Sequence, residues 1–160
     1  MRDTPHQTHK NFLIIFSRRN KAVDGKATID LLKERLNKNI DDVEAAISLG
    51  NLYYDNGDAG QSVLYYRLAL DIDPALSGVR TDLGAMYWHN ENISLAERAF
   101  REAISRDSGF GQAYVNLGLL LHHAKGDTTG ARSVWQQLVT ADPGHAAADK
   151  ARELLRETAH

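Results

Sequence analysis

Histidine is the residue type in this sequence whose chemistry most invites a metal ion. The chain holds seven histidines, with His122 beside His123 and His89 one 34-residue step before His123. Adjacent helical residues point about 100° apart, and equivalent residues on stacked helices lie about 8–10 Å apart. Zinc needs each ligand at about 2.0–2.1 Å, and no Glu completes a His-Glu-x-x-His pattern. We therefore expect no metal site and expect these histidines to line a groove or face solvent.

Nucleophilic, redox and phosphate-binding chemistry find no support in the sequence. The chain has no cysteine, which excludes thiolate nucleophiles, thiolate metal sites and disulfides. The glycine-containing stretch 57–60 lacks the Lys-Ser/Thr of a phosphate loop, and no serine stands in a nucleophile elbow. The acidic pairs Asp41-Asp42 and Asp71/Asp73 fall at expected helix ends. The sequence predicts a protein that is not an enzyme and needs no cofactor.

The composition is typical of one folded domain. The chain has 160 residues, of which 42% are hydrophobic and 25% charged; this length can bury about two thirds of the unfolded surface. The first forty residues carry a net charge of +5 and the remainder −7. Since a nucleic-acid-binding body is expected to be basic, we predict no nucleic-acid partner.

The chain repeats itself with a period of 34 residues. Leu-Gly-x-x-Tyr begins at Leu49 and again at Leu83, and Leu-Gly-x-x-Leu begins at Leu117. A small residue four positions before a large aromatic follows in each copy: Ser62 and Tyr66, Ala96 and Phe100, Ala131 and Trp135. Pro74 and Pro143 close two of the copies, where proline ends a helix.

This spacing predicts a helix–turn–helix unit. Apolar residues at steps of three and four place one stripe on each first helix. A glycine in each first helix costs about 1 kcal/mol relative to alanine, which is tolerable where another helix approaches closely; these are Gly50, Gly84 and Gly118. The expected N-caps of the second helices are Asp58, Asn92 and Asp127. Asp41 and Glu44 have capping-box spacing at the start of the first repeat.

At these residues the chain resembles the tetratricopeptide repeat (TPR) family, as a small bacterial-type member with three repeats. The resemblance covers residues 43–76, 77–110 and 111–145. It implies an all-α fold, a right-handed α-solenoid. The sequence departs from the family pattern where a large residue is expected, at Ala46, Arg80 and Tyr114, and at Ser108 in place of the closing proline.

The flanks predict caps for this array. Residues 28–38 align with a second helix one period earlier, and residues 145–158 form a helix with one apolar stripe. Both shield the ends of a stack, as a solenoid requires. The resulting division is a basic, partly flexible segment at 1–26 and a TPR domain at 27–160.

The resemblance implies that the first helices line a concave surface that holds a peptide. The expected groove residues are Ile47, Asn51, Tyr54, Asp82, Ala85, Trp88, His89, Asn116, Leu119 and His122. Tyr54, Trp88 and His122 form a ladder in register, which either anchors a ligand or packs between neighbouring first helices. We expect Trp88 to be the most exposed of the three, and Trp135 on a second helix to be buried.

The charge of the expected groove indicates the charge of its ligand. Glu44, Asp55 and Asp82 are the full charges expected in the groove, so a bound protein or peptide should be neutral or basic. One subset of the family grips the carboxylate of chaperone tails with basic residues and asparagines. The matching positions are Ile47, Asn51, Asp82, Gln112 and Asn116. Asn51 alone has the expected type there, so we predict no binding of chaperone tails.

The prediction is therefore a scaffold or adaptor. Two alternatives are a self-associating module (a homo-oligomer), which would use the apolar run Phe12–Phe16, and an assembly factor for envelope or cytochrome complexes, suggested by analogy alone. Five apolar residues are far short of the twenty or so that span a bilayer, so we expect no stable membrane insertion. The expected location is cytoplasmic, with peripheral membrane association through the basic segment as the alternative.

Overall fold

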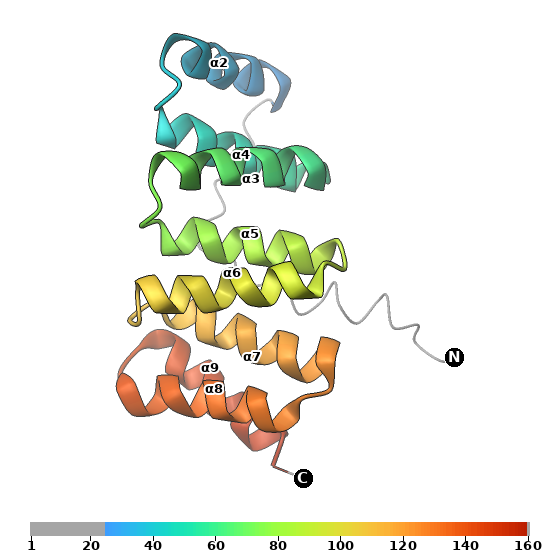
Figure 1. The fold of residues 1–160 in the computed structure, drawn as a ribbon, viewed down its shortest axis with the longest axis vertical. Helices are drawn as coiled ribbons and strands as arrows, with labels where there is room; N and C mark the ends of the chain where they lie inside the picture. Colours follow the sequence, from blue (N-terminus) through green and yellow to red (C-terminus); the bar gives the residue numbers. More distant parts are fainter. Residues whose placement is uncertain (1–24, 160) are drawn as a thin grey trace, which may run out of the picture.

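The computed structural model describes residues 25–159, and every regular element in that range is a helix (Figure 1). The expected all-α solenoid is confirmed. The helices are α2 (Gly25–Lys38), α3 (Val43–Asp55), α4 (Ala59–Ile72), α5 (Ser77–His89), α6 (Ile93–Arg106), α7 (Gly111–Lys125), α8 (Thr128–Ala141) and α9 (Ala146–Glu157). The hypotheses on the apolar run Phe12–Phe16 and on the basic segment up to residue 24 lie outside the described residues.

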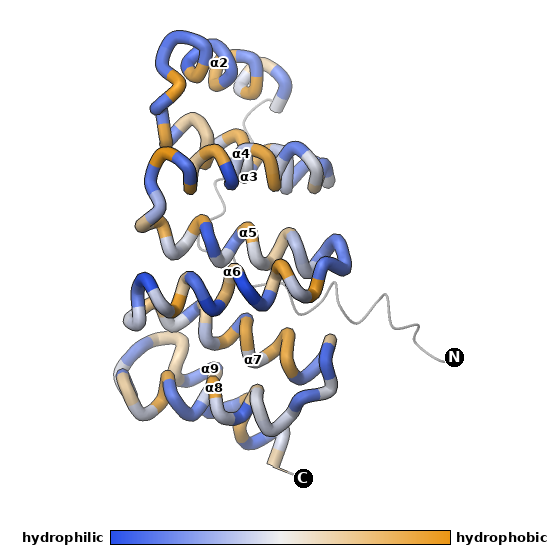
Figure 2. The backbone as a smooth tube through the Cα atoms, in the orientation of Figure 1, coloured by the Kyte–Doolittle hydropathy of each residue, from blue (hydrophilic) through white to orange (hydrophobic). Residues whose placement is uncertain are grey.

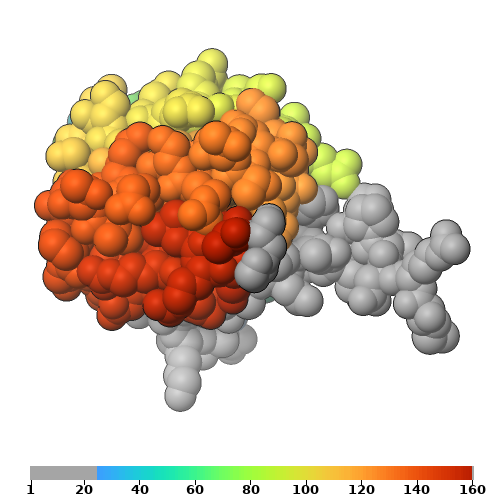
Figure 3. Space-filling model, turned by 90° about the horizontal axis from the view of Figure 1, so that it is seen from below, coloured from blue at the N-terminus to red at the C-terminus, as the bar shows by residue number. Residues whose placement is uncertain are grey.

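The helices stack as successive hairpins. α3 with α4, α5 with α6 and α7 with α8 form the three repeats, while α2 packs on α3 and α9 packs on α8 (Figure 1). The first helices also touch across repeats, α5 with α7 and α7 with α9. They form an inner layer, and α4, α6 and α8 form an outer one. Viewed from the C-terminal end, α8 and α9 form the near face of the stack, with atoms of α7 and α6 visible beside them (Figure 3).

Each hairpin is held by an aromatic ring seated on a glycine. A Cβ on Gly84 would lie 2.6 Å from Cε1 of Phe100, closer than atoms can pack. Tyr66 covers Gly50 and Trp135 covers Gly118 in the same way. Trp135 is fully buried, as predicted, and its Nε1 donates to the Val115 carbonyl at 3.3 Å. The glycines are therefore where the second helix of each repeat meets the first.

The helix N-termini confirm two expected caps and correct another. Asp58 accepts from the Gln61 amide at 3.0 Å, and Asp127 accepts from the Gly130 amide at 2.8 Å. Asn92 stands at the N-cap of α6, but its side chain makes no capping hydrogen bond.

The capping box expected from Asp41 and Glu44 is wrong. α3 starts at Val43, so Asp42 is the N-cap and its carboxylate accepts from the Ala45 amide at 3.0 Å. That amide, together with the Arg35 guanidinium, holds the pKa of Asp42 below its ordinary value.

The terminal helices differ slightly from the expected ranges. α2 begins at Gly25, three residues before the predicted start, and buries Leu32 and Leu36. α9 runs from Ala146 to Glu157 within the expected 145–158, and His145 caps it by accepting from the Ala147 amide at 3.0 Å.

A charged bridge connects the second and third repeats. Glu97 on α6 accepts from Lys125 on α7 at 2.8 Å and from Arg101, one turn along α6, at 2.8 Å. The Lys125 ammonium, followed by the Arg101 guanidinium, lowers the pKa of Glu97. The carboxylate is mostly shielded from solvent, so its charge is held by these two partners.

We expect Glu97→Gln to remove a stabilisation that depends on pH. Because the folded pKa of Glu97 lies below the unfolded one, the stabilisation is complete above about pH 4.3, the ordinary Glu pKa. It is lost as the pH falls through the folded pKa. Urea unfolding at pH 7 should show a loss of about 0.2–1 kcal/mol, and the difference between wild type and variant should shrink as the pH is lowered to 3. Glu153→Gln on α9 is the control, and a loss that persisted unchanged at pH 3 would contradict the charge-based explanation.

Candidate peptide-binding groove

All ten residues of the predicted groove lie on the inner layer of helices. They are Ile47, Asn51 and Tyr54 on α3, then Asp82, Ala85, Trp88 and His89 on α5, then Asn116, Leu119 and His122 on α7. Their placement follows from the repeat, because the glycine and leucine of each first helix face the outer layer. The residues on the opposite side of that helix therefore face the inner side.

A polar centre joins the first two repeats. Tyr66 on α4 reaches α3, where its hydroxyl donates a hydrogen bond to Asn51 Oδ1 at 2.6 Å. Burial first, and then the negative charge of Asp82, raise the pKa of Tyr66 well above its ordinary value. Asp82 is itself only 6% exposed. Asn51 therefore already accepts a hydrogen bond from a core tyrosine, and Asp82 contributes a negative charge near that tyrosine.

An apolar centre joins the second and third repeats, and here one expectation is wrong. Trp88 is not exposed: it is only 2% accessible and packs in one hydrophobic cluster with Ala85 and Leu119. The same cluster contains Val115 and Leu119 of α7, and α5 and α7 contact each other across the two repeats. Of the two readings of the aromatic ladder, packing between neighbouring first helices is the correct one for Trp88.

The histidines at the far end do not converge. His122 Nδ1 lies 2.9 Å from Thr128 Oγ1, so this ring is directed toward the turn between α7 and α8. Its neighbour His123 meets it edge to face at 4.6 Å, and His89 is exposed on α5. Within residues 25–159, no three His, Cys, Asp or Glu side chains lie together in a way that could hold a metal ion.

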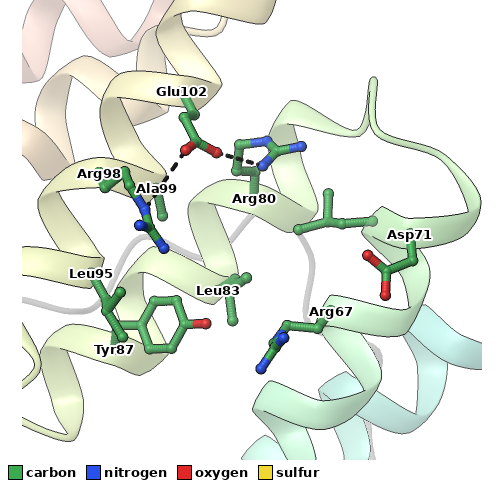
Figure 4. Close-up of a pocket in the computed structure, with 10 residues that line it drawn as sticks. Arg67, Asp71, Arg80, Leu83, Tyr87, Leu95, Arg98, Ala99 and Glu102 are labelled. Carbon is green, nitrogen blue, oxygen red and sulfur yellow. Dashed lines mark hydrogen bonds and ion pairs between the residues drawn. The ribbon is translucent and has the colours of Figure 1, made fainter.

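The sequence reasoning did not identify a polar pocket between α4, α5 and α6. The pocket has a volume of about 180 Å³, and Figure 4 shows arginines from all three helices around it. Arg80 pairs with Glu102 at 2.8 Å and donates to the Pro74 carbonyl at 3.0 Å. Arg98 approaches the same carboxylate at 3.8 Å. The signal was present in Arg80, which replaces a large apolar residue of the repeat pattern, but its acidic partner lies 22 residues away.

The described helices also bear on the membrane question. Across residues 25–159, no helix is long and apolar enough to cross a bilayer.

Comparison with known proteins agrees with this architecture. Residues 43–76 and 81–146 each match a sequence family described as Tetratricopeptide repeat. No curated protein matches the sequence.

Solved structures match the fold at low sequence identity. The crystal structure of MamA superposes with a TM-score of 0.66 at 18% identity, over 87% of this chain and 94% of that one. The TPR2B domain of yeast Sti1, solved in a complex with pHsp70, gives 0.66 at 18% identity, over 73% and 95%. The first TPR of Spaghetti (RPAP3), bound to the HSP90 peptide SRMEEVD, gives 0.58 at 19% identity, over 86% and 100%.

The two sequence matches cover the three repeats almost without a gap. In each repeat the aromatic ring of the second helix packs on the glycine of the first, as the repeat pattern requires. The chain belongs to the tetratricopeptide repeat family.

Proposed function

We propose that this protein is a non-enzymatic adaptor that holds a neutral or basic peptide segment of a partner protein along the inner faces of α3, α5 and α7. One observation carries the proposal. Asp82 on α5 is a nearly buried carboxylate whose charge reaches Tyr66 in the polar centre, and the same helix carries Trp88 of the apolar centre. A ligand with a cation beside apolar side chains matches both centres.

The energetics favour such a ligand over an acidic one. The Asp82 carboxylate attracts a lysine or arginine of a ligand, whereas a ligand carboxylate placed beside it is repelled at short range. The apolar residue of the ligand would then lie along the inner faces of α5 and α7.

This ligand class differs from that of two relatives in fold. The RPAP3 domain binds the acidic peptide SRMEEVD, and the Sti1 domain forms a complex with pHsp70. Of the five positions expected to grip a terminal carboxylate, Asn51 alone has the expected residue type in this chain: the three basic residues are absent, and Asp82 would repel a carboxylate. We therefore propose that the protein does not take chaperone tails of that kind.

Binding of two matched peptides to the full chain tests the proposal. Each probe is a fluorescein-labelled twelve-residue peptide with a central Phe-Leu-Ile run, one with four lysines and the other with four glutamates. We expect the lysine peptide to bind at least tenfold more tightly by fluorescence anisotropy. Asp82→Asn should weaken it about tenfold, which is about 1.4 kcal/mol, because the variant keeps the size of the side chain and removes its charge.

The control is Asp149→Asn on the exposed face of α9, which makes the same chemical change away from the inner layer. Circular dichroism melts of all variants show that each is folded. Tighter binding of the glutamate peptide, or an Asp82→Asn variant with unchanged affinity, would contradict the proposal. Light scattering of the same samples tests the alternative of a self-associating module. A dimer that does not bind the peptide would favour that alternative.

A further inference from the structure

The pocket between α4, α5 and α6 gathers three arginines on an otherwise acidic body. Arg67, Arg80 and Arg98 line it together with the carboxylates Asp71 and Glu102, so three positive charges meet two negative ones. The chain beyond its first forty residues carries a net charge of −7, and its surface is hydrophilic on much of the outer layer (Figure 2). Because α4 belongs to the first repeat and α5 and α6 to the second, the pocket lies at the joint between these repeats (Figure 4).

Arg80 forms the shielded wall of this pocket. Its side chain is 11% exposed and donates to the Glu102 carboxylate at 2.8 Å and to the Pro74 carbonyl at 3.0 Å. The Nε donor of the same guanidinium is buried and meets no acceptor among residues 25–159. A guanidinium carries five N–H donors, and a buried donor without a partner is destabilising. Glu102 and Pro74 therefore hold this cation in place without satisfying all of its donors.

The other two arginines lie at the mouth of the pocket. Arg67 on α4 is exposed and forms no ion pair within the described part of the chain. Arg98 on α6 is 69% exposed, and its Nε lies 3.8 Å from Glu102, too far for a hydrogen bond. Figure 4 shows both guanidinium groups and the Tyr87 hydroxyl directed toward the space beside Leu83. Donors from α4, α5 and α6 therefore face one space.

The repeat architecture does not require these arginines. The equivalent pocket one repeat later is lined by uncharged residues of the described range: Tyr114, Ser133, Gln136, Gln137, Thr140 and Ala141. Tyr114 stands at the repeat position of Arg80, and Ser133 stands at that of Arg98. The arginines are therefore particular to the joint between the first and second repeats.

We propose that this pocket binds a phosphate group, either free phosphate or the phosphate of a small organic ester. A guanidinium presents a planar fork of donors that matches phosphate oxygens. A phosphate ester carries about −1.5 to −2 charge at neutral pH on three acceptor oxygens. It can accept from Arg67, Arg98 and the Tyr87 hydroxyl together, whereas a carboxylate offers one charge and two oxygens.

The two carboxylates at the pocket leave room for one anion. Glu102 is turned toward Arg80, and the two side chains form a neutral pair (Figure 4). At the mouth, the positive charges of Arg67 and Arg98 then face the single negative charge of Asp71. The volume of about 180 Å³ is below the 300–1,000 Å³ or so of pockets that hold drug-sized molecules. The pocket therefore suits one phosphate group with at most a short stem.

This site is separate from the proposed peptide groove. Arg80 and Leu83 lie on the side of α5 that meets α4 and α6, whereas the groove uses the inner side of the same helix. A phosphate held by Arg67 of the first repeat and Arg98 of the second would link the two repeats. The inference does not rest on the proposed function, and either can be disproved without the other.

Amide NMR of the full chain labelled with nitrogen-15 tests the site. Sodium phosphate replaces sodium chloride at pH 7 and constant ionic strength, so that screening of surface charge stays the same. The amide signals of the residues flanking Arg67, Arg80 and Arg98 should shift along one saturable curve, with a dissociation constant in the low millimolar range. Shifts that grow without saturation, or that spread over the whole surface, would overturn the inference.

Matched variants locate the bound ion. Arg67→Gln and Arg98→Gln should each weaken phosphate binding at least fivefold, because each removes one charge and its donors. Arg101→Gln is the control: Arg101 is also exposed and stands at the repeat position of Arg67 one repeat later, so its loss should leave binding unchanged. Circular dichroism melts verify that each variant is folded. An equal loss of binding in all three variants would mean diffuse attraction to positive surface and would overturn the inference.

Two further ligands identify the anion. Sodium acetate should bind at least tenfold more weakly than phosphate, and equal binding of acetate would overturn the assignment to phosphate. Butyl phosphate presents the same group on an apolar stem. Tighter binding of butyl phosphate than of free phosphate would support an organic ester whose stem contacts Leu83 and Leu95, which line the pocket. Weaker binding of butyl phosphate would support free phosphate as the ligand.

Discussion

Trp135→Ala should lower the free energy of unfolding by about 3–5 kcal/mol, the usual cost of deleting a fully buried large aromatic. The indole is inaccessible to solvent, covers Gly118 and donates to the Val115 carbonyl. Its loss opens a cavity between α7 and α8 and leaves that carbonyl without this donor. In a stacked array each repeat contacts only its neighbours, so α9, which packs on α8 and α7, should loosen as well.

Urea denaturation followed by circular dichroism measures this loss. The control is Leu64→Ala on the exposed side of α4, which should change stability by less than about 0.5 kcal/mol. The chain has two tryptophans, so the fluorescence of the Trp135→Ala variant reports Trp88 alone and shows whether the α5–α7 contact survives. An unchanged urea midpoint for Trp135→Ala would mean that the 34-residue register is misplaced.

The features that could be predicted from the sequence are those decided within one hairpin. The leucine, glycine and aromatic residue of each repeat lie within 20 residues of one another in the chain, so their spacing in the sequence is enough to predict the contact. N-caps are equally local, and Asp58 and Asp127 were predicted for that reason. The N-cap was assigned to Asp41 and not to Asp42 because both adjacent aspartates fit the cap. Which of them caps the helix depends on the length of the preceding turn to within one residue.

The features that could not be predicted depend on how repeats meet. Trp88 stands off the apolar stripe of its own helix, so a helical pattern alone places it toward solvent. Its burial comes from the contact of α5 with α7 and from the apolar residues that α7 supplies, such as Leu119. Likewise, the Arg80–Glu102 pair joins residues on two helices whose facing sides no single periodicity reveals. Membership of the inner layer was therefore predictable, while exposure within it was not.

Gly84→Ala should destabilise the protein by about 1–3 kcal/mol, the cost of overpacking a filled site, although alanine is the better helix former. Helix propensity alone predicts a gain of about 1 kcal/mol for this change. The added methyl would lie 2.6 Å from Phe100 Cε1, and the fully buried ring has no free space to move into. The clash should therefore exceed the gain in propensity.

Two further variants isolate the cause. At Gly60, also helical, the nearest atom to an added Cβ is Asp58 Oδ1 at an ordinary 3.6 Å, so Gly60→Ala should be neutral or stabilising by up to about 1 kcal/mol. Replacing Phe100 by leucine removes the ring, so Gly84→Ala should cost much less in that background, with a coupling of about 0.5–3 kcal/mol between the two sites. A rise in melting temperature for Gly84→Ala in the wild-type background would show that the second repeat does not close on its glycine. Since Gly50 and Gly118 face their rings in the same way, that result would remove the packing explanation for all three repeats.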